Sequence, residues 1–159
     1  MNCRIYNKLI ILLILAGISG CGTFPSRDSN SKPSQLANKN QVVIYSAMQY
    51  IGTPYEYGGT SDEGIDCSGL VYLAFQNAGI PVPRTSLLQY RKSNRIHPSN
   101  LLPGDLVFFK LERGNPVSHV GIYIGKQRFI HAPRTGKNVE YASLNNRFWS
   151  ARFTGAGRF

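Results

Sequence analysis

Cys67 is the residue of this sequence best suited to nucleophilic chemistry. It lies in the run GIDCSG, directly before an apolar segment whose hydrophobic residues recur at helical spacing through Ala78. We expect a helix that starts at or next to Cys67, with Asp66 as its N-cap and Gly79 at its C-terminal end. The positive end of a helix dipole favours the thiolate, which is the nucleophilic form of cysteine. The same pattern also fits a small buried residue that begins a helix, the commoner state of a lone cysteine.

Two of the three histidines are predicted to lie on consecutive strands. His119 begins an alternating segment that runs to Ile124, and His131 lies in a second strand over 127–132. A tight turn is expected at Gly125-Lys126. If the loop has three residues, paired residue numbers sum to 250, and the two histidines lie directly opposite each other with Cβ atoms about 5 Å apart. A two-residue loop would put them on opposite faces of the sheet.

A thiol at a helix start, a histidine on a neighbouring strand and a second polar ring are the parts of a cysteine peptidase. The thiolate attacks a carbonyl carbon. The first histidine balances the charge of the thiolate and later protonates the leaving amine, and the third group fixes the tautomer of that histidine. The two histidines could equally be satisfied core or surface residues. No third ligand at metal-binding spacing accompanies them, so we expect no metal and no other cofactor. His97, in a polar loop before Pro98, is expected to take no part.

The surrounding pattern predicts an α+β fold, with helices first and an antiparallel sheet after them. An amphipathic helix is expected from Gln41 to Ile51, ahead of the Cys67 helix, and a short helix over 84–93. The run Leu106–Phe109 predicts a strand buried on both faces. The remaining expected elements are the two histidine strands, a strand over 139–142, a short helix that Ser143 caps and that contains Trp149, and a closing strand from Ala151.

The N-terminus has the features of a lipoprotein export signal. Arg4 and Lys8 precede an apolar run that is too short to span a bilayer and that ends in Ile18-Ser19-Gly20-Cys21, which looks like a bacterial lipobox. We therefore expect a signal peptide over 1–20 and a lipid anchor such as palmitate on Cys21. A flexible tether is expected over 21–40 and one folded domain over 41–159. Cys67 is then the one thiol left in the mature chain.

Charge narrows the class of partner. The chain has 159 residues and a formal net charge of +10, and removal of residues 1–20 leaves +8. Such a balance suits an anionic partner: nucleic acid, acidic lipid or an anionic wall polymer. The basic residues are scattered, without a zinc finger, a phosphate-binding loop or an aromatic-basic stripe. A nucleic-acid partner is therefore not expected.

Several runs in fixed order resemble the NlpC family of bacterial cell-wall cysteine peptidases, in particular its small lipoprotein members. These runs are GTPYEYGG, GIDCSGLV, LPGDLVFFK, HVGIYIG and FIHA, and the similarity extends from about Gln41 to the C-terminus. The resemblance implies a papain-like α+β fold, with Cys67 as nucleophile, His119 as general base and His131 as the orienting residue. It implies that Tyr55 helps to bind the oxyanion, together with the backbone N–H of Cys67. Asp66 and Ser68 are expected to cap the helix and shape the cleft.

The resemblance also implies a substrate and a location. The family cleaves peptidoglycan stem peptides next to meso-diaminopimelate, either at the D-glutamyl–diaminopimelate bond or at the diaminopimelate–D-alanine cross-link; these residues leave the choice of bond open. We expect a monomer that is lipid-anchored in the cell envelope, at the outer membrane of a Gram-negative bacterium and facing the periplasm. Two alternatives stay open: a papain-like amidase or acyltransferase, and a non-catalytic peptidoglycan-binding lipoprotein.

Overall fold

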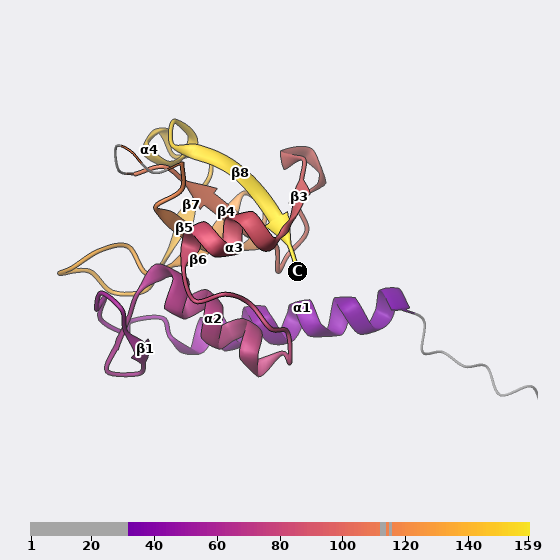
Figure 1. Ribbon diagram of the computed structural model, residues 1–159, viewed down its shortest axis with the longest axis horizontal. Helices are drawn as coiled ribbons and strands as arrows, with labels where there is room; N and C mark the ends of the chain where they lie inside the picture. The colour runs from indigo at the N-terminus through magenta and orange to yellow at the C-terminus, as the bar shows by residue number, and fades with distance from the viewer. Residues whose placement is uncertain (1–31, 112–113, 115) are drawn as a thin grey trace, which may run out of the picture.

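A six-stranded antiparallel sheet forms the centre of the protein (Figure 1). The computed structural model describes residues 32–111, 114 and 116–159. The strand order in the sheet is β3-β8-β4-β5-β6-β7. These strands are β3 (Asn94–Ile96), β4 (Leu106–Phe109), β5 (His119–Gly125), β6 (Arg128–His131), β7 (Glu140–Ser143) and β8 (Phe153–Arg158).

The helices and a small hairpin surround this sheet. Figure 1 shows α1 and α2 together on one side of it and α4 at the other end of the molecule. The elements outside the sheet are α1 (Lys32–Gln49), the hairpin of β1 (Thr60–Ser61) and β2 (Gly64–Ile65), α2 (Cys67–Asn77), α3 (Ser86–Lys92), a 3₁₀ turn (Pro98–Asn100) and α4 (Arg147–Ser150). The predicted α+β class is confirmed.

The core has two parts because β4 is buried on both faces, as its unbroken apolar run predicts. Leu106 and Phe108 face α1 and α2 and belong to the larger cluster. Val107 and Phe109 face the opposite side, where Trp149 packs against them. A large apolar side chain buried in this way stabilises the fold by about 1.5–3 kcal/mol. The sheet therefore separates two apolar clusters, one shared with α1 and α2 and the other with α4.

The first helix starts earlier than the sequence pattern predicts. It begins at Lys32, so residues 32–40 are helical, and the expected flexible tether is wrong for that part. The reason is local: after Pro33, which a helix tolerates in its first turn, no glycine or proline occurs before Gly52. Asn40 also contacts the body of the protein, since its Nδ2 donates to the carbonyl oxygen of Pro103 at 3.1 Å. The predicted signal peptide and Cys21 lie outside the described residues.

Most other predicted elements occur within one or two residues of their expected bounds. The cap of α4 is an exception, because Asn146, and not Ser143, accepts a hydrogen bond from the N–H of Phe148. The hairpin β1–β2 and the short strand β3 were not predicted, since two or three residues carry too little periodicity to detect.

Candidate active site

Cys67 is the first residue of α2, as predicted. Oδ1 of Asp66 accepts a hydrogen bond from the N–H of Gly69 at 2.6 Å, which confirms Asp66 as the N-cap. The helix ends at Asn77, and Gly79 has a φ of +67°, a left-handed conformation that glycine adopts without strain. Local sequence signals therefore determine both ends of the helix that carries the thiol.

Asp66 is also held by Arg84 in a bidentate ion pair. The distances are 2.8 Å from Nη1 to Oδ1 and 2.9 Å from Nη2 to Oδ2, and Nη2 also donates to the carbonyl oxygen of Gly59 at 3.0 Å. Burial raises the pKa of Asp66, but hydrogen bonds from Arg84 and from the N–H of Gly69 outweigh it and hold the pKa below its ordinary value. The ionised carboxylate ties the start of α2 to the segment before α3.

The residues after Cys67 pack closely against the same segments. A Cβ atom at position 69 would collide with the carbonyl oxygen of Gly59, so only glycine fits there. Gln89 of α3 is fully buried, and its Nε2 donates to the carbonyl oxygens of Ser68 at 3.1 Å and Pro83 at 2.8 Å. The GIDCSG run thus folds as a rigid start of α2 that α3 supports.

The structure brings the two predicted histidines together. Nε2 of His119 and Nδ1 of His131 are 2.9 Å apart, within hydrogen-bond distance, so the prediction that both lie on one face is confirmed. The register argument behind it was wrong. The turn consists of Lys126 and Gln127, and a bulge between Tyr123 and Gly125 shifts the pairing, so that Tyr123 faces Phe129.

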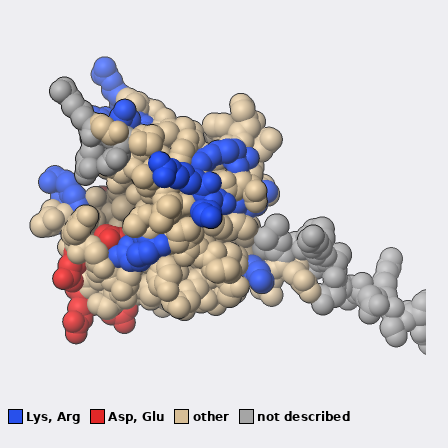
Figure 2. All heavy atoms as spheres, in the orientation of Figure 1, with Lys and Arg blue, Asp and Glu red and all other residues tan. Residues whose placement is uncertain are grey.

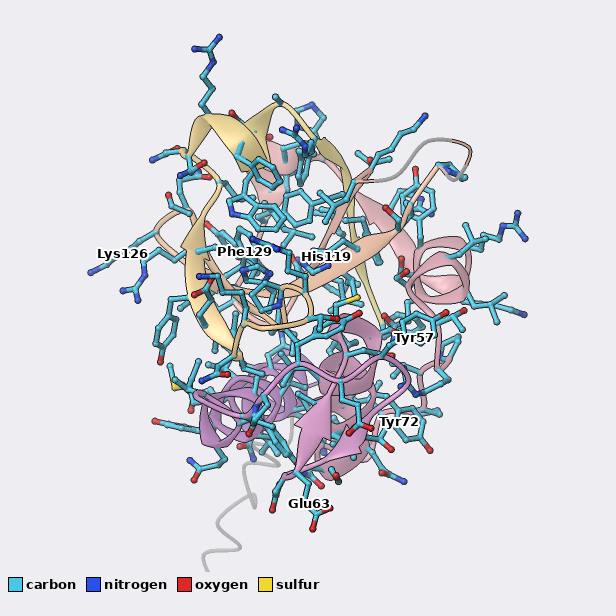
Figure 3. The ribbon with its side chains drawn as sticks, turned by 90° about the vertical axis from the view of Figure 1, so that its left-hand side faces the viewer. Tyr57, Glu63, Tyr72, His119, Lys126 and Phe129 are labelled. Atoms are coloured by element: carbon cyan, nitrogen blue, oxygen red, sulfur yellow. The ribbon has the colours of Figure 1, made fainter. Side chains whose placement is uncertain are left out.

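The two rings are buried among aromatic side chains. Trp149 stacks on His119 with ring centroids 5.4 Å apart and meets His131 edge-on at 4.7 Å. In Figure 3, His119 lies next to Phe129 on the sheet side of the molecule. Burial lowers the pKa of His119 to about 3; burial and then His119 lower that of His131 to about 2. Both rings are therefore neutral at pH 7.

The thiol of Cys67 lies beside Val120, the residue that follows His119 on β5. The backbone N–H groups of Val120 and Ser68 act on the sulfur of Cys67 and lower its pKa, but burial is the larger effect and raises the pKa to about 12. The expected preference for the thiolate at the helix start is therefore outweighed by burial, since Cys67 is only 8% exposed. At rest, the site holds a thiol and neutral imidazoles.

An open cavity of about 500 Å³ gives access to Cys67. Tyr55 lies in its wall, on an extended segment bridged to Ile65, so the structure places this predicted site residue in the cleft. His119 and His131 are buried and are not among the residues that line it. The cavity is lined by Tyr55, Tyr57, Gly58, Asp66, Cys67, Ser68, Arg84, Thr85, Ser86, Leu87, Val117 and Ser118.

The sequence reasoning missed Arg84, Gln89 and Trp149. A buried carboxylate at position 66 needs a countercharge, but nothing in the sequence says which of the basic residues supplies it. His97 is exposed and caps the 3₁₀ turn. Within the described residues, no group of three His, Cys, Asp or Glu side chains is placed to hold a metal ion.

Comparison with known proteins identifies this arrangement. The model of the NlpC/P60 family matches residues 52–158, which include Cys67 and both buried histidines. The chain belongs to the NlpC/P60 family. Murein DD-endopeptidase MepH of Escherichia coli K12 is 41% identical over 82% of this chain and 49% of its own length. The probable endopeptidase NlpC of the same strain is 35% identical over 94% of this chain and 97% of its own.

A solved structure agrees with the family assignment. An NlpC/P60 family protein from Bacillus cereus ATCC 10987 matches 76% of this chain and 40% of its own chain, with a TM-score of 0.71 and 36% identity. This NlpC/P60 chain spans about half the length of MepH and nearly all of NlpC. None of the helices in the part of the chain that the structure describes has the length and apolar character to cross a membrane.

Proposed function

We propose that this protein is a cysteine-type cell-wall endopeptidase that cleaves peptide bonds in peptidoglycan stem peptides. Membership of the NlpC/P60 family and the endopeptidase names of MepH and NlpC support this reaction class. The observation that carries the proposal is the position of Cys67. It starts a helix, lines an open cavity and lies beside β5, whose His119 is within hydrogen-bond distance of His131 on β6.

In the proposed mechanism, His119 accepts the proton of Cys67 as the sulfur attacks the scissile carbonyl carbon. Both groups start neutral, so proton transfer accompanies the formation of the C–S bond. The oxyanion would be bound by the backbone N–H of Cys67, which has no acceptor within its helix, and by the hydroxyl of Tyr55. His119 then returns the proton to the leaving amine as the C–N bond breaks, and water hydrolyses the thioester.

His131 acts in this mechanism as the orienting residue. Its Nδ1 engages Nε2 of His119, which leaves Nδ1 of His119 for the thiol proton. Packing against Trp149 limits rotation of both rings. A general base that is held in one tautomer and one orientation loses less entropy on reaching the transition state.

The proposed substrate bond is the cross-link between meso-diaminopimelate and D-alanine. The name of MepH, a murein DD-endopeptidase, favours this bond over the one between D-glutamate and diaminopimelate. The side chain of Arg84 is 34% exposed at the cleft, which suits a substrate rich in carboxylates. We further propose that the protein acts as a monomer anchored through Cys21 at the periplasmic face of the outer membrane.

Digestion of purified sacculi by the wild-type protein and by Cys67→Ser tests this function. Under reducing conditions, the wild type should convert dimeric muropeptides to intact tetrapeptide monomers, and Cys67→Ser should release at least about 10³-fold less, since oxygen is the poorer nucleophile here. The Cys67→Ser protein should unfold at the wild-type temperature, because the two side chains differ by one atom.

Other products would change the conclusion in defined ways. Release of dipeptide-bearing monomers would move the cleaved bond to D-glutamyl–diaminopimelate. Full activity of Cys67→Ser would refute the nucleophile. If wild-type protein with a reduced thiol left all muropeptides unchanged, the peptidase proposal would fail.

A further inference from the structure

His131 carries a buried nitrogen that no group in the site satisfies. Its side chain is 0% exposed, and its Nε2 is one of two buried side-chain N or O atoms among the described residues without a hydrogen-bond partner, the other being Oε1 of Gln89. A buried polar atom without a partner costs about 1–3 kcal/mol, so its presence beside a catalytic pair calls for a physical reason.

The tautomers of the histidine pair give this nitrogen a proton. When Nδ1 of His119 is free to accept the thiol proton, its Nε2 carries a hydrogen and donates it to Nδ1 of His131. A neutral His131 that accepts at Nδ1 must then carry its own hydrogen at Nε2. The unsatisfied atom is therefore a donor, and it needs an acceptor.

Glu140 is the acidic residue next to that donor. It lies on β7 directly opposite His131 in the antiparallel ladder, and its Oε1 is 4.0 Å from Nε2 of His131. Its side chain is 56% exposed, so it can change rotamer without repacking the core. At 4.0 Å there is no hydrogen bond, but a shift of about 1 Å would bring the two atoms to the usual distance.

Among the charged and titratable groups around the histidine pair, Glu140 is the one carboxylate in direct contact with His131 in the described part of the chain. His119 faces His131 from β5, while Trp149 and Phe129 pack against it as neutral rings. Asp66 acts on His119 through its charge, but it is already bound by Arg84.

We propose that Glu140 is a positioning residue that accepts the Nε2 hydrogen of His131 and closes a chain from Cys67 through His119 and His131. When His119 takes the thiol proton, the hydrogen-bonded chain places a negative charge at its far end and stabilises the imidazolium. The thiolate–imidazolium pair is then more populated than burial alone would allow. The proton of the thiol moves only to His119, and Glu140 stays ionised throughout.

The experiment compares Glu140→Gln with Glu63→Gln in the full-length protein. Both changes remove one exposed acidic charge, but Glu63 lies in the β1–β2 turn, well away from His119 (Figure 3). The rate of alkylation of Cys67 by iodoacetamide is measured from pH 5 to 9, and peptide mass spectrometry restricts the readout to this cysteine. This rate reports the thiolate directly and needs no peptidoglycan substrate.

Glu140→Gln should lower the alkylation rate at pH 7 by about five-fold, and Glu140→Ala by at least as much, while Glu63→Gln stays at the wild-type rate. The melting temperature of each variant should match that of the wild type. If Glu140 had only a structural role, its loss would lower the melting temperature as well as the alkylation rate. On sacculi, kcat should fall in parallel with little change in KM.

The proposal is overturned if both Glu140 variants alkylate within two-fold of the wild type, or if Glu63→Gln slows the reaction equally. It rests on the proposed function only for the sacculus assay. A wild type without activity on sacculi, combined with slower alkylation in Glu140→Gln, would remove the endopeptidase and leave the role of Glu140 standing.

Discussion

At the scale of single residues, the site combines two buried rings with a buried thiol, all neutral at rest. Burial lowers the pKa of His119 and of His131 and raises that of Cys67, since each charged form would lose its hydration. The catalytic proton transfer therefore starts from an uncharged site, and the free energy of charge separation must come from the groups around it: two backbone N–H groups, the histidine pair and its neighbours.

Buried neutral histidines make stability depend on pH. The unfolded chain binds protons on these rings below about pH 6.5 while the folded protein does not, so the free energy of unfolding falls as the pH drops from about 6.5 toward 3. Urea unfolding from pH 7 to 5 should show a loss with a slope approaching about 1.4 kcal/mol per pH unit for each histidine. His131→Asn should remove one histidine's share of this slope.

The exposed His97 provides the matched control. His97→Asn should leave the wild-type slope intact, because it replaces an exposed residue of the 3₁₀ turn and does not touch the buried histidine pair. Equal slopes for His131→Asn and the wild type would contradict the assignment of a buried neutral ring.

At the scale of elements, the β5–β6 hairpin determines whether the two histidines meet. Its turn residues Lys126 and Gln127 have φ angles of +50° and +58°, which identifies a type I′ turn formed without its preferred Asn-Gly sequence. Each non-glycine residue in this conformation costs about 1–2 kcal/mol. The strain is located in an exposed turn, where Lys126 points away from the protein (Figure 3).

Replacing Lys126-Gln127 by Asn-Gly should therefore stabilise the protein by about 1 kcal/mol, since the new pair adopts the turn with less strain. The opposite change, Gln127→Val, should destabilise it by a similar amount because a β-branched side chain resists positive φ. Thermal unfolding measures both. If Asn-Gly lowered the melting temperature, the turn would not be the type I′ turn described here.

At the scale of the whole molecule, one ion pair connects the turn before β4 to the end of β8. In the sheet, β8 lies between β3 and β4. Asp105 is fully buried, and Arg158 binds it through two hydrogen bonds of 2.6 and 2.8 Å. Oδ2 of Asp105 also accepts from the N–H of Leu102 at 2.7 Å. The pair joins positions 53 residues apart in the chain, where β8 ends next to the start of β4.

Arg158→Met should destabilise the protein by about 2 kcal/mol, because the carboxylate of Asp105 stays buried without its cation. Adding Asp105→Asn should recover part of this loss, as expected for two residues in contact. Arg134→Met, at an exposed arginine, is the control and should change stability by less than about 0.5 kcal/mol. Urea denaturation measures the free energy of unfolding of each variant. If Arg158→Met lowered it no more than the control does, the ion pair would contribute nothing to stability.

Charge is unevenly distributed over the same molecule. Figure 2 shows the acidic side chains gathered at the end that carries the β1–β2 hairpin, with lysine and arginine over the sheet side and α3.

The proposed lipid anchor on Cys21 would hold this charged domain at a membrane. Cys21→Ala should move the protein from the membrane to the soluble fraction, or leave its precursor unprocessed, when cells are fractionated. Wild-type protein found free in the periplasm would refute the anchor.

The sequence by itself determined the features that depend on neighbours along the chain. Asp66 and Gly79 mark the ends of the Cys67 helix through hydrogen bonding and backbone freedom, which operate within a few residues. The unbroken apolar run of β4 and the alternation in β5 predicted their strands for the same reason. The ordered motifs likewise predicted the family.

Only the tertiary structure decided what depends on distant contacts. A bulge whose position no local signal marks placed His119 against His131 in a register different from the predicted one. Folding brought Arg84 to Asp66 and Glu140 next to His131, across 18 and 9 positions of the chain. Burial reversed the expected effect of the helix start on the thiol, because desolvation depends on everything packed around Cys67 and not on its neighbours in sequence.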